Sequence, residues 1–211
     1  RADLVAVRAN WSDNPWFDQG PLPTERQEDQ RSRPEDYGHV WEGDYQNFAD
    51  AQILKGKVEV TTFTAPEDAR FYYGVDWGFA KDPLAALRCC IVGNVLYVDY
   101  EAGGVGVELD AIPAILEQIP QARQWPWKAD GARPETISFL ARIYGFRMSA
   151  AKKWPGSVED GIARLKAFER IVVHPRCKHL VQECRLYSYR VDKDTGDVLP
   201  IVEDAHNHWI D

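Results

Sequence analysis

The sequence predicts an α/β fold with a mixed sheet, in which three antiparallel strands precede parallel strands, helices flank the sheet and a β-hairpin is added. The first observation is a set of three closely spaced apolar and aromatic runs, at 71–76, 84–92 and 95–100. The second is the alternation of helical and strand patterns that follows, which is typical of parallel strands joined by helices. The third is a pair of strand-like runs, 187–191 and 198–202, around a polar turn.

The individual elements can be placed in order along the chain. Gly93-Asn94 forms a hairpin turn suited to positive φ, and apolar residues at helical spacing then predict a helix over 107–119, ended by Pro120. Ser157 to Asp160 resembles a capping box at the start of a later helix. Further strands are expected at 127–130, 146–150 and 171–174, and further helices at 134–144, 157–169 and 177–186. This order is the one expected of a ribonuclease H-like fold.

The first third of the chain has a different composition. Residues 1–66 are rich in Pro, Asp, Glu and Gln, which predicts a linker or extension before a main domain at 67–211. Within the extension, 34–37 fits a short helical turn, and 58–63 alternates like a strand that pairs with the main sheet. No Gly-x-x-x-x-Gly-Lys-Ser/Thr loop occurs in the sequence, so this chain has no P-loop for nucleotide phosphates.

The composition is that of an ordinary globular protein, with 45% hydrophobic and 27% charged residues. No apolar run approaches the roughly 20 residues of a membrane-spanning helix, and the N-terminus lacks a secretion-signal pattern, so we expect a cytosolic protein without a membrane partner. Cys89 and Cys90 are adjacent in a strand-like run and point to opposite faces, which favours reduced thiols. Cys177 and Cys184 lie near two histidines but lack the close CxxC pair typical of structural zinc.

Charge is segregated along the chain. The net charge is −8, yet the stretch 142–193 has twelve Lys and Arg against five Asp and Glu, a balance of +7 that leaves −15 for the rest. DNA enzymes need only a local positive track, although such a stretch is also typical of a solvated surface. Because Lys and Arg neutralise phosphates, Lys152, Lys153, Arg190 and Lys193 are the candidate DNA contacts.

Several acidic residues are candidates for metal binding. Asp76 ends an apolar strand, where an ionised carboxylate is costly without a counter-charge, and Asp130 repeats this feature. His208 and Asp211 are three residues apart and share one face if the chain is helical there. Carboxylates gathered at one sheet edge hold Mg²⁺ and support phosphodiester cleavage. Taken singly, Asp76 and Asp130 are more readily explained as loop or helix caps. Asp211 could be a first-turn acid favoured by the helix dipole, and Asp204 is either a cap or an outer acid.

Four segments in order carry a more specific signal: GVDWGFAKDP at 74–83, ADGARP at 129–134, PGSVEDGI at 155–162 and NHWID at 207–211. Together they resemble the motifs of the nuclease domain of tailed-phage terminase large subunits. The upstream segments DNPWF at 13–17 and YGHVWEGDY at 37–45 resemble the part that joins the packaging ATPase to that nuclease. The resemblance covers nearly the whole chain.

The resemblance implies a ribonuclease H-like endonuclease that cuts concatemeric viral DNA during genome packaging. It implies that Asp76, Asp130 and Asp211 bind Mg²⁺ or Mn²⁺, as two ions, with His208 as a further ligand or water-orienting group. The implied partners are double-stranded DNA and, through the full-length protein, the terminase small subunit and the portal, in the host cytoplasm. We expect a fragment that lacks an ATPase domain, because the chain begins without Met and the family pattern continues past its end.

Alternatives remain open at this stage. The chain could serve as a non-catalytic module that docks on DNA or the portal and depends on the missing ATPase half. His206-Asn207-His208 could be taken as an HNH nuclease motif, but that fold needs a further ββα context downstream. Glu101, at a strand end, is an additional candidate ligand where other ribonuclease H-like enzymes place a glutamate.

Overall fold

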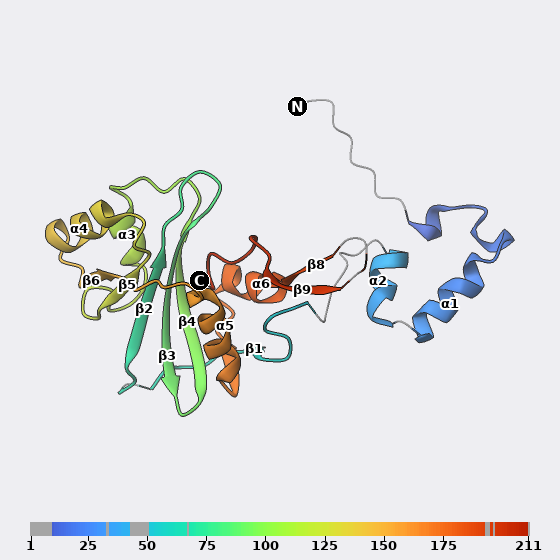
Figure 1. Ribbon diagram of the computed structural model, residues 1–211, viewed down its shortest axis with the longest axis horizontal. Helices are drawn as coiled ribbons and strands as arrows, with labels where there is room; N and C mark the ends of the chain where they lie inside the picture. The colour runs from blue at the N-terminus through green and yellow to red at the C-terminus, as the bar shows by residue number, and fades with distance from the viewer. Residues whose placement is uncertain are drawn as a thin grey trace. The chain divides into compact units, whose positions relative to one another are not determined.

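The computed structural model describes residues 10–32, 34–42, 51–66, 68–192, 195 and 197–210. The predicted site residues Lys193 and Asp211 lie outside the described residues. The chain divides into two compact units, 1–50 and 51–211, and both are drawn in Figure 1. The predicted boundary at residue 66 stays a prediction.

The first unit is helical. Its elements are η1 (Trp11–Asp13), η2 (Phe17–Gln19), α1 (Leu22–Ser32) and α2 (Pro34–Glu42). Only a short turn was expected here, because α1 buries none of its residues and so shows no apolar periodicity. Phe17 is buried, and its ring lies 5.0 Å from that of Trp11 and 6.0 Å from that of Trp41. These three aromatic rings give the unit its small core.

The second unit is built on a seven-stranded sheet with the order β1-β7-β4-β3-β2-β5-β6 (Figure 1). The strands are β1 (Val58–Val60), β2 (Phe71–Asp76), β3 (Leu84–Val92), β4 (Val95–Gly104), β5 (Trp127–Ala129), β6 (Met148–Ala150) and β7 (Arg170–Val173). Strand β3 is antiparallel to its neighbours β2 and β4, and the other pairs are parallel. The predicted mixed sheet and the pairing of the 58–63 region with it are both confirmed.

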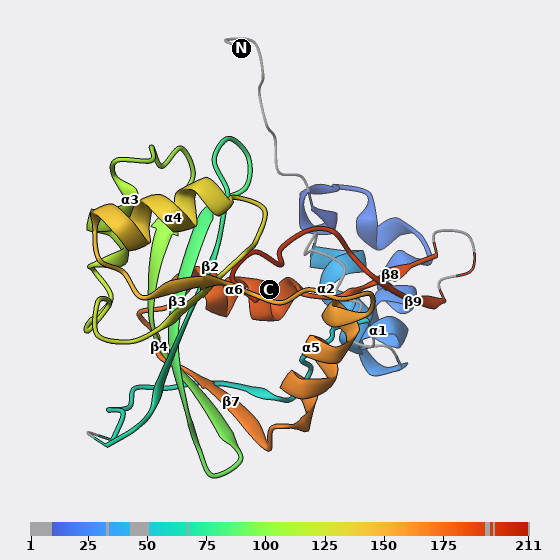
Figure 2. The same cartoon turned by 60° about the vertical axis from the view of Figure 1, so that its left-hand side comes forward.

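Helices cover both faces of this sheet. They are α3 (Ile112–Leu116), α4 (Pro134–Ile143), α5 (Ser157–Ala167) and α6 (Lys178–Leu186). Figures 1 and 2 show α3 and α4 on one face and α5 and α6 on the other. Each face has its own buried core, centred on residues such as Leu116 and Trp127 on the first and Val173 and Leu180 on the second. The period-two burial of β2 follows from this arrangement, since one of its faces contacts the first core.

Two local predictions were wrong. Helix α3 is shorter than the predicted 107–119, because it begins only at Ile112 and residues after Leu116 continue as turns with i→i+3 hydrogen bonds. Helix α5 does begin at Ser157, but its N-cap is Gly156, with φ 86° and no side-chain capping bond. The capping-box prediction for Ser157 therefore does not hold.

The predicted β-hairpin is confirmed as a separate two-stranded sheet. Strands β8 (Tyr189–Val191) and β9 (Val198–Val202) are antiparallel and pair with each other. All four cysteines are free thiols, and Cys89 and Cys90 contact opposite cores, as their adjacent positions in a strand predict. Across the part of the chain that the structure describes, none of the helices has the length and apolarity to span a bilayer.

Candidate metal centre

The sheet brings the first two candidate aspartates to neighbouring strand ends. Val75 pairs with Ala129 across the parallel strands β2 and β5, and the backbone N–H of Asp130 donates to the Val75 carbonyl at 3.0 Å. Asp76 and Asp130 directly follow these paired positions, so both lie at the carboxyl edge of the sheet. The indole Nε1 of Trp77 donates to the Asp130 carbonyl at 2.7 Å and ties the two strand ends together.

Asp76 is a half-buried carboxylate whose ionisation is made costly by its surroundings. Its Oδ1 accepts a hydrogen bond from the backbone N–H of Trp77 at 3.0 Å. Burial raises the pKa of Asp76 and outweighs the Trp77 hydrogen bond, which lowers it. The negative charge of Asp130 adds to the rise, and the charges of His208 and Lys153 have smaller lowering effects. Because the charge of Asp130 makes ionisation of Asp76 more costly, a cation bound between the two carboxylates would be favoured.

Asp130 has a different environment because a lysine lies beside it. Its Oδ1 lies 2.9 Å from the Lys153 Nζ and accepts a hydrogen bond from the backbone N–H of Ala132 at 3.2 Å. Burial works to raise the pKa of Asp130, but these hydrogen bonds and the Lys153 charge outweigh it and lower the pKa. Lys153, which the sequence indicated as a DNA contact, therefore belongs to the candidate centre itself.

His208 approaches the same edge from the C-terminal segment. Its Nδ1 lies 3.8 Å from Asp76 Oδ2, and its Nε2 lies 3.4 Å from Asp82 Oδ1. Asp82 was not singled out from the sequence, although it falls within the motif at 74–83. Gly78 allows this loop to close, because a Cβ there would lie 2.1 Å from the Asp82 carbonyl oxygen.

The segment that carries His208 is anchored to α6. The backbone N–H of Trp209 donates to Glu183 Oε2 at 2.7 Å, and the buried Trp209 ring stacks on His179 with centroids 4.9 Å apart. Burial raises the pKa of Glu183, and the Trp209 hydrogen bond opposes that rise. Glu101 also serves α6, since it accepts the backbone N–H groups of His179 and Leu180, each at 3.0 Å. Sequence reasoning missed Glu183, because nothing local marks a contact 26 residues away.

The donor set fits a hard divalent cation. Mg²⁺ is usually held by one or two carboxylates together with waters and substrate phosphates, and Asp76 and Asp130 offer this minimal pair. Among the residues that the structure describes, no group of three His, Cys, Asp or Glu side chains is arranged to hold a metal ion. Burial raises the pKa of both the Cys177 and the Cys184 thiol to about 12.

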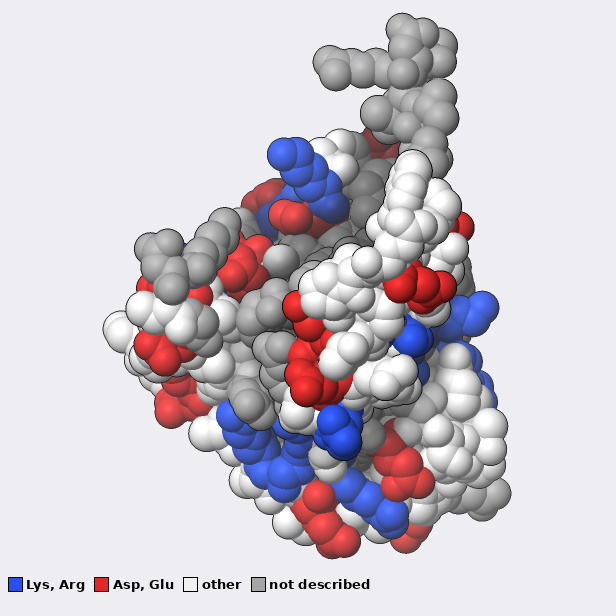
Figure 3. Space-filling view, turned by 90° about the vertical axis from the view of Figure 1, so that its right-hand side faces the viewer, with Lys and Arg blue, Asp and Glu red and all other residues white. Residues whose placement is uncertain are grey.

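The remaining candidate residues are spread over the surface. Lys152 is exposed beside Lys153, Asp204 is exposed, and Arg190 on β8 lies 3.7 Å from Glu203 on β9. On the face drawn in Figure 3, Lys and Arg atoms lie among Asp and Glu atoms rather than forming a continuous basic cover.

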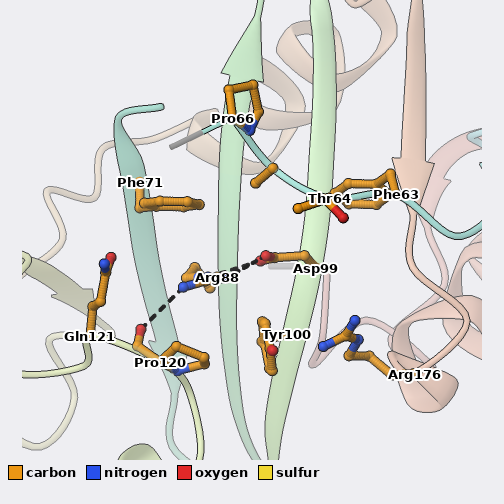
Figure 4. A pocket seen from close by; sticks show the side chains of 11 residues that line it. Phe63, Thr64, Pro66, Phe71, Arg88, Asp99, Tyr100, Pro120, Gln121 and Arg176 are labelled. Atoms are coloured by element: carbon orange, nitrogen blue, oxygen red, sulfur yellow. Dashed lines mark hydrogen bonds and ion pairs between the residues drawn. The ribbon is translucent and has the colours of Figure 1, made fainter. Parts of the chain in front are cut away.

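A pocket of about 340 Å³ lies elsewhere on the second unit, walled by the segment before β2 and by residues of β2, β3 and β4 (Figure 4). A β-bulge beside the Arg88–Tyr100 pair leaves Asp99 without a partner in the strand register, and Arg88 Nε donates to Asp99 Oδ1 at 2.9 Å. The Arg88 guanidinium is sandwiched between Phe71 and Tyr100, at 4.3 and 4.6 Å from their ring centroids. None of the candidate metal-centre residues described above lines this pocket, so the two features are separate.

The mixed sheet flanked by helices, with acidic residues at the ends of adjacent strands, is the architecture of a ribonuclease H-like domain. Residues 76–211 match the family described as Terminase RNAseH like domain, and the chain belongs to this family.

Known relatives agree with this assignment. The chain is 29% identical over 219 residues to the terminase large subunit of Bacillus phage SPP1, which covers 100% of this chain and 51% of that protein. It is 29% identical over 126 residues to the PBSX phage terminase large subunit of Bacillus subtilis strain 168, covering 59% of this chain and 29% of that protein. The chain thus spans about half or less of the length of these relatives.

Solved structures show the same fold. The large terminase (g2p) nuclease domain of bacteriophage SPP1 with bound Mn is 27% identical, with a TM-score of 0.65 over 74% of this chain and 92% of that one. The P22 large terminase nuclease domain is 19% identical, with a TM-score of 0.54 over 72% and 81% of the two chains. The predicted ribonuclease H-like fold is therefore confirmed.

Proposed function

We propose that this chain is a divalent-metal-dependent endonuclease that cuts concatemeric viral DNA during genome packaging. The observation that carries the proposal is the placement of Asp76 and Asp130 at adjacent strand ends of a terminase nuclease fold, with His208 beside Asp76. The SPP1 nuclease domain, whose structure contains bound Mn, supports divalent-metal binding by this chain.

The side chains have distinct tasks in this proposal. Asp76 and Asp130 would hold two ions, Mg²⁺ or Mn²⁺, through carboxylate oxygens, and Asp211 would complete the ligand set. When bound, the ions supply charge relief on the phosphate and an activated water. His208, between Asp76 and Asp82, would orient the attacking water or provide a further ligand.

Double-stranded DNA is the proposed substrate, and basic groups near the centre would hold its backbone. The proposed phosphate contacts are Lys152 and Lys153 at the centre and Arg190 and Lys193 of the hairpin region, because Lys and Arg drive sequence-independent binding. We infer that 67–211 is the nuclease domain and that 1–66 extends toward an ATPase domain of a longer protein. That protein would meet the terminase small subunit and the portal in the host cytoplasm.

A plasmid-cutting assay tests the proposed activity. The chain should convert supercoiled plasmid to nicked and linear forms with Mg²⁺ or Mn²⁺, and excess chelator should stop the conversion. Asp76→Asn and Asp130→Asn should each abolish cutting, whereas Asp110→Asn, on an exposed turn, should not. A chain that binds DNA or the portal but never cuts, even at high Mn²⁺, would instead favour the docking module.

A further inference from the structure

Lys153 acts on both strand-end carboxylates. Its Nζ lies 2.9 Å from Asp130 Oδ1. Its positive charge also reaches Asp76, whose pKa it works to lower against the larger effect of burial. The Lys153 ammonium therefore interacts electrostatically with both Asp76 and Asp130, the two carboxylates that are proposed to hold the metal ions.

The Lys153 ammonium and the backbone N–H of Ala132 both donate to the same oxygen, Asp130 Oδ1. A carboxylate oxygen has about two lone-pair directions, and Asp130 Oδ1 already faces Lys153 Nζ at 2.9 Å and the Ala132 backbone N–H at 3.2 Å. The Ala132 N–H is held by the backbone just before α4, whereas the Lys153 side chain is flexible and 67% exposed. A cation that coordinated this oxygen would therefore displace Lys153.

Electrostatics act in the same direction. The ionised Asp76 and Asp130 side chains attract a divalent cation, and a unit positive charge beside Asp130 repels the same cation. We propose that Lys153 is a built-in counter-ion that competes with divalent metal for Asp130 and transfers its ammonium to a DNA phosphate when substrate binds. This inference rests on the proposed function, because it requires a metal site at Asp76 and Asp130.

The exchange would couple metal binding to DNA binding. When a phosphate accepts the Lys153 ammonium, Asp130 Oδ1 becomes available to metal, so each ligand should raise the affinity for the other. The centre would then bind metal tightly only where a DNA backbone is present. In the absence of DNA, Lys153 would lower the affinity of the centre for metal.

The competition can be measured without DNA cutting, by titrating the full chain with Mn²⁺ and following free Mn²⁺ by electron paramagnetic resonance. Lys153→Met should bind Mn²⁺ about tenfold more tightly than wild type, the order that Coulomb's law gives for a unit charge a few ångströms from a divalent ion in a water-like dielectric. Lys153→Arg, which keeps the charge, should stay close to wild type. Lys178→Met, at an exposed position on α6, is the matched control and should not change the affinity.

A second arm repeats the titration with duplex DNA that carries nuclease-resistant phosphorothioate linkages, under conditions in which gels show that the DNA stays intact. Added DNA should tighten Mn²⁺ binding by a larger factor for wild type than for Lys153→Met. Equal affinities of wild type and Lys153→Met without DNA, or equal enhancement with it, would overturn this inference alone. Absence of Mn²⁺ binding by wild type would overturn the proposed metal site, and this inference with it.

Discussion

The hydrogen bond between Glu183 and Trp209 holds the C-terminal segment beside Asp76, and substitutions at Glu183 test this role. Glu183 is a buried acid on α6, and its Oε2 accepts the backbone N–H of Trp209 at 2.7 Å. In Glu183→Ala this N–H loses its acceptor in a buried environment, which costs about 1–3 kcal/mol. For a chain of this size each kcal/mol lowers the melting temperature by about 2–4 °C.

Glu183→Gln separates the hydrogen bond from the charge. The amide oxygen of Gln can still accept the Trp209 N–H, so this variant should lose much less stability than Glu183→Ala. Burial raises the pKa of Glu183 in the folded state, so its stabilising contribution is greatest below its ordinary pKa and is lost as the pH rises through the folded-state pKa. The free energy of unfolding of Glu183→Gln should therefore rise relative to that of wild type as the pH increases from about 4 toward neutrality.

Urea unfolding and thermal melting at several pH values measure both effects, with Glu108→Ala at an exposed position as the control. Cutting by folded Glu183→Ala at 25 °C should also fall below that of Glu183→Gln, because His208 adjoins the anchored Trp209. Equal stability of the Ala and Gln variants would refute the anchor. A pH-independent difference between wild type and Glu183→Gln would refute the assigned effect of burial.

Four further predictions concern the strand ends and the loop that follows β2. Asp130→Asn should lower the pKa of Asp76, because it removes a negative charge that raises it, and carbon-13 NMR of the Asp76 carboxyl measures the change. In wild type, the Mn²⁺ affinity should fall as the pH drops through the raised Asp76 pKa, since protons and metal compete for that carboxylate. A Mn²⁺ affinity that does not change down to about pH 4 would contradict this prediction. Trp77→Phe removes the 2.7 Å hydrogen bond to the Asp130 carbonyl and should cost about 0.5–1.5 kcal/mol in urea unfolding. Gly78→Ala should lower the melting temperature more than Trp77→Phe does, because the added Cβ would lie 2.1 Å from the Asp82 carbonyl oxygen. An unchanged melting temperature would show that the loop adapts to the added methyl group.

Sequence patterns predicted the fold well where local signals are strong. The strands at 71–76 and 84–92 were predicted at their observed bounds, because apolar runs, a hairpin turn and strand-length segments all agree there. Helix α1 was missed because it is polar on every side and buries none of its residues. Its stability depends on helix-forming Glu, Arg and Gln residues, and composition of that kind is shared with linkers.

The candidate centre was predictable only in part. Asp76 and Asp130 were indicated because each ends an apolar strand, and parallel strands share a carboxyl edge. The position of Lys153 at this edge was not predictable, since its ion pair joins residues 23 positions apart through tertiary structure. The contact of Asp82 with His208 is of the same kind, because it joins residues at opposite ends of the domain.

A crystal of the chain soaked in Mn²⁺ tests the central claim most directly. The account predicts anomalous density between Asp76 and Asp130, with carboxylate oxygens about 2.0–2.3 Å from the ion, and displacement of the Lys153 ammonium from Asp130. Density confined to other sites, with the Lys153 to Asp130 ion pair intact at saturating Mn²⁺, would contradict it.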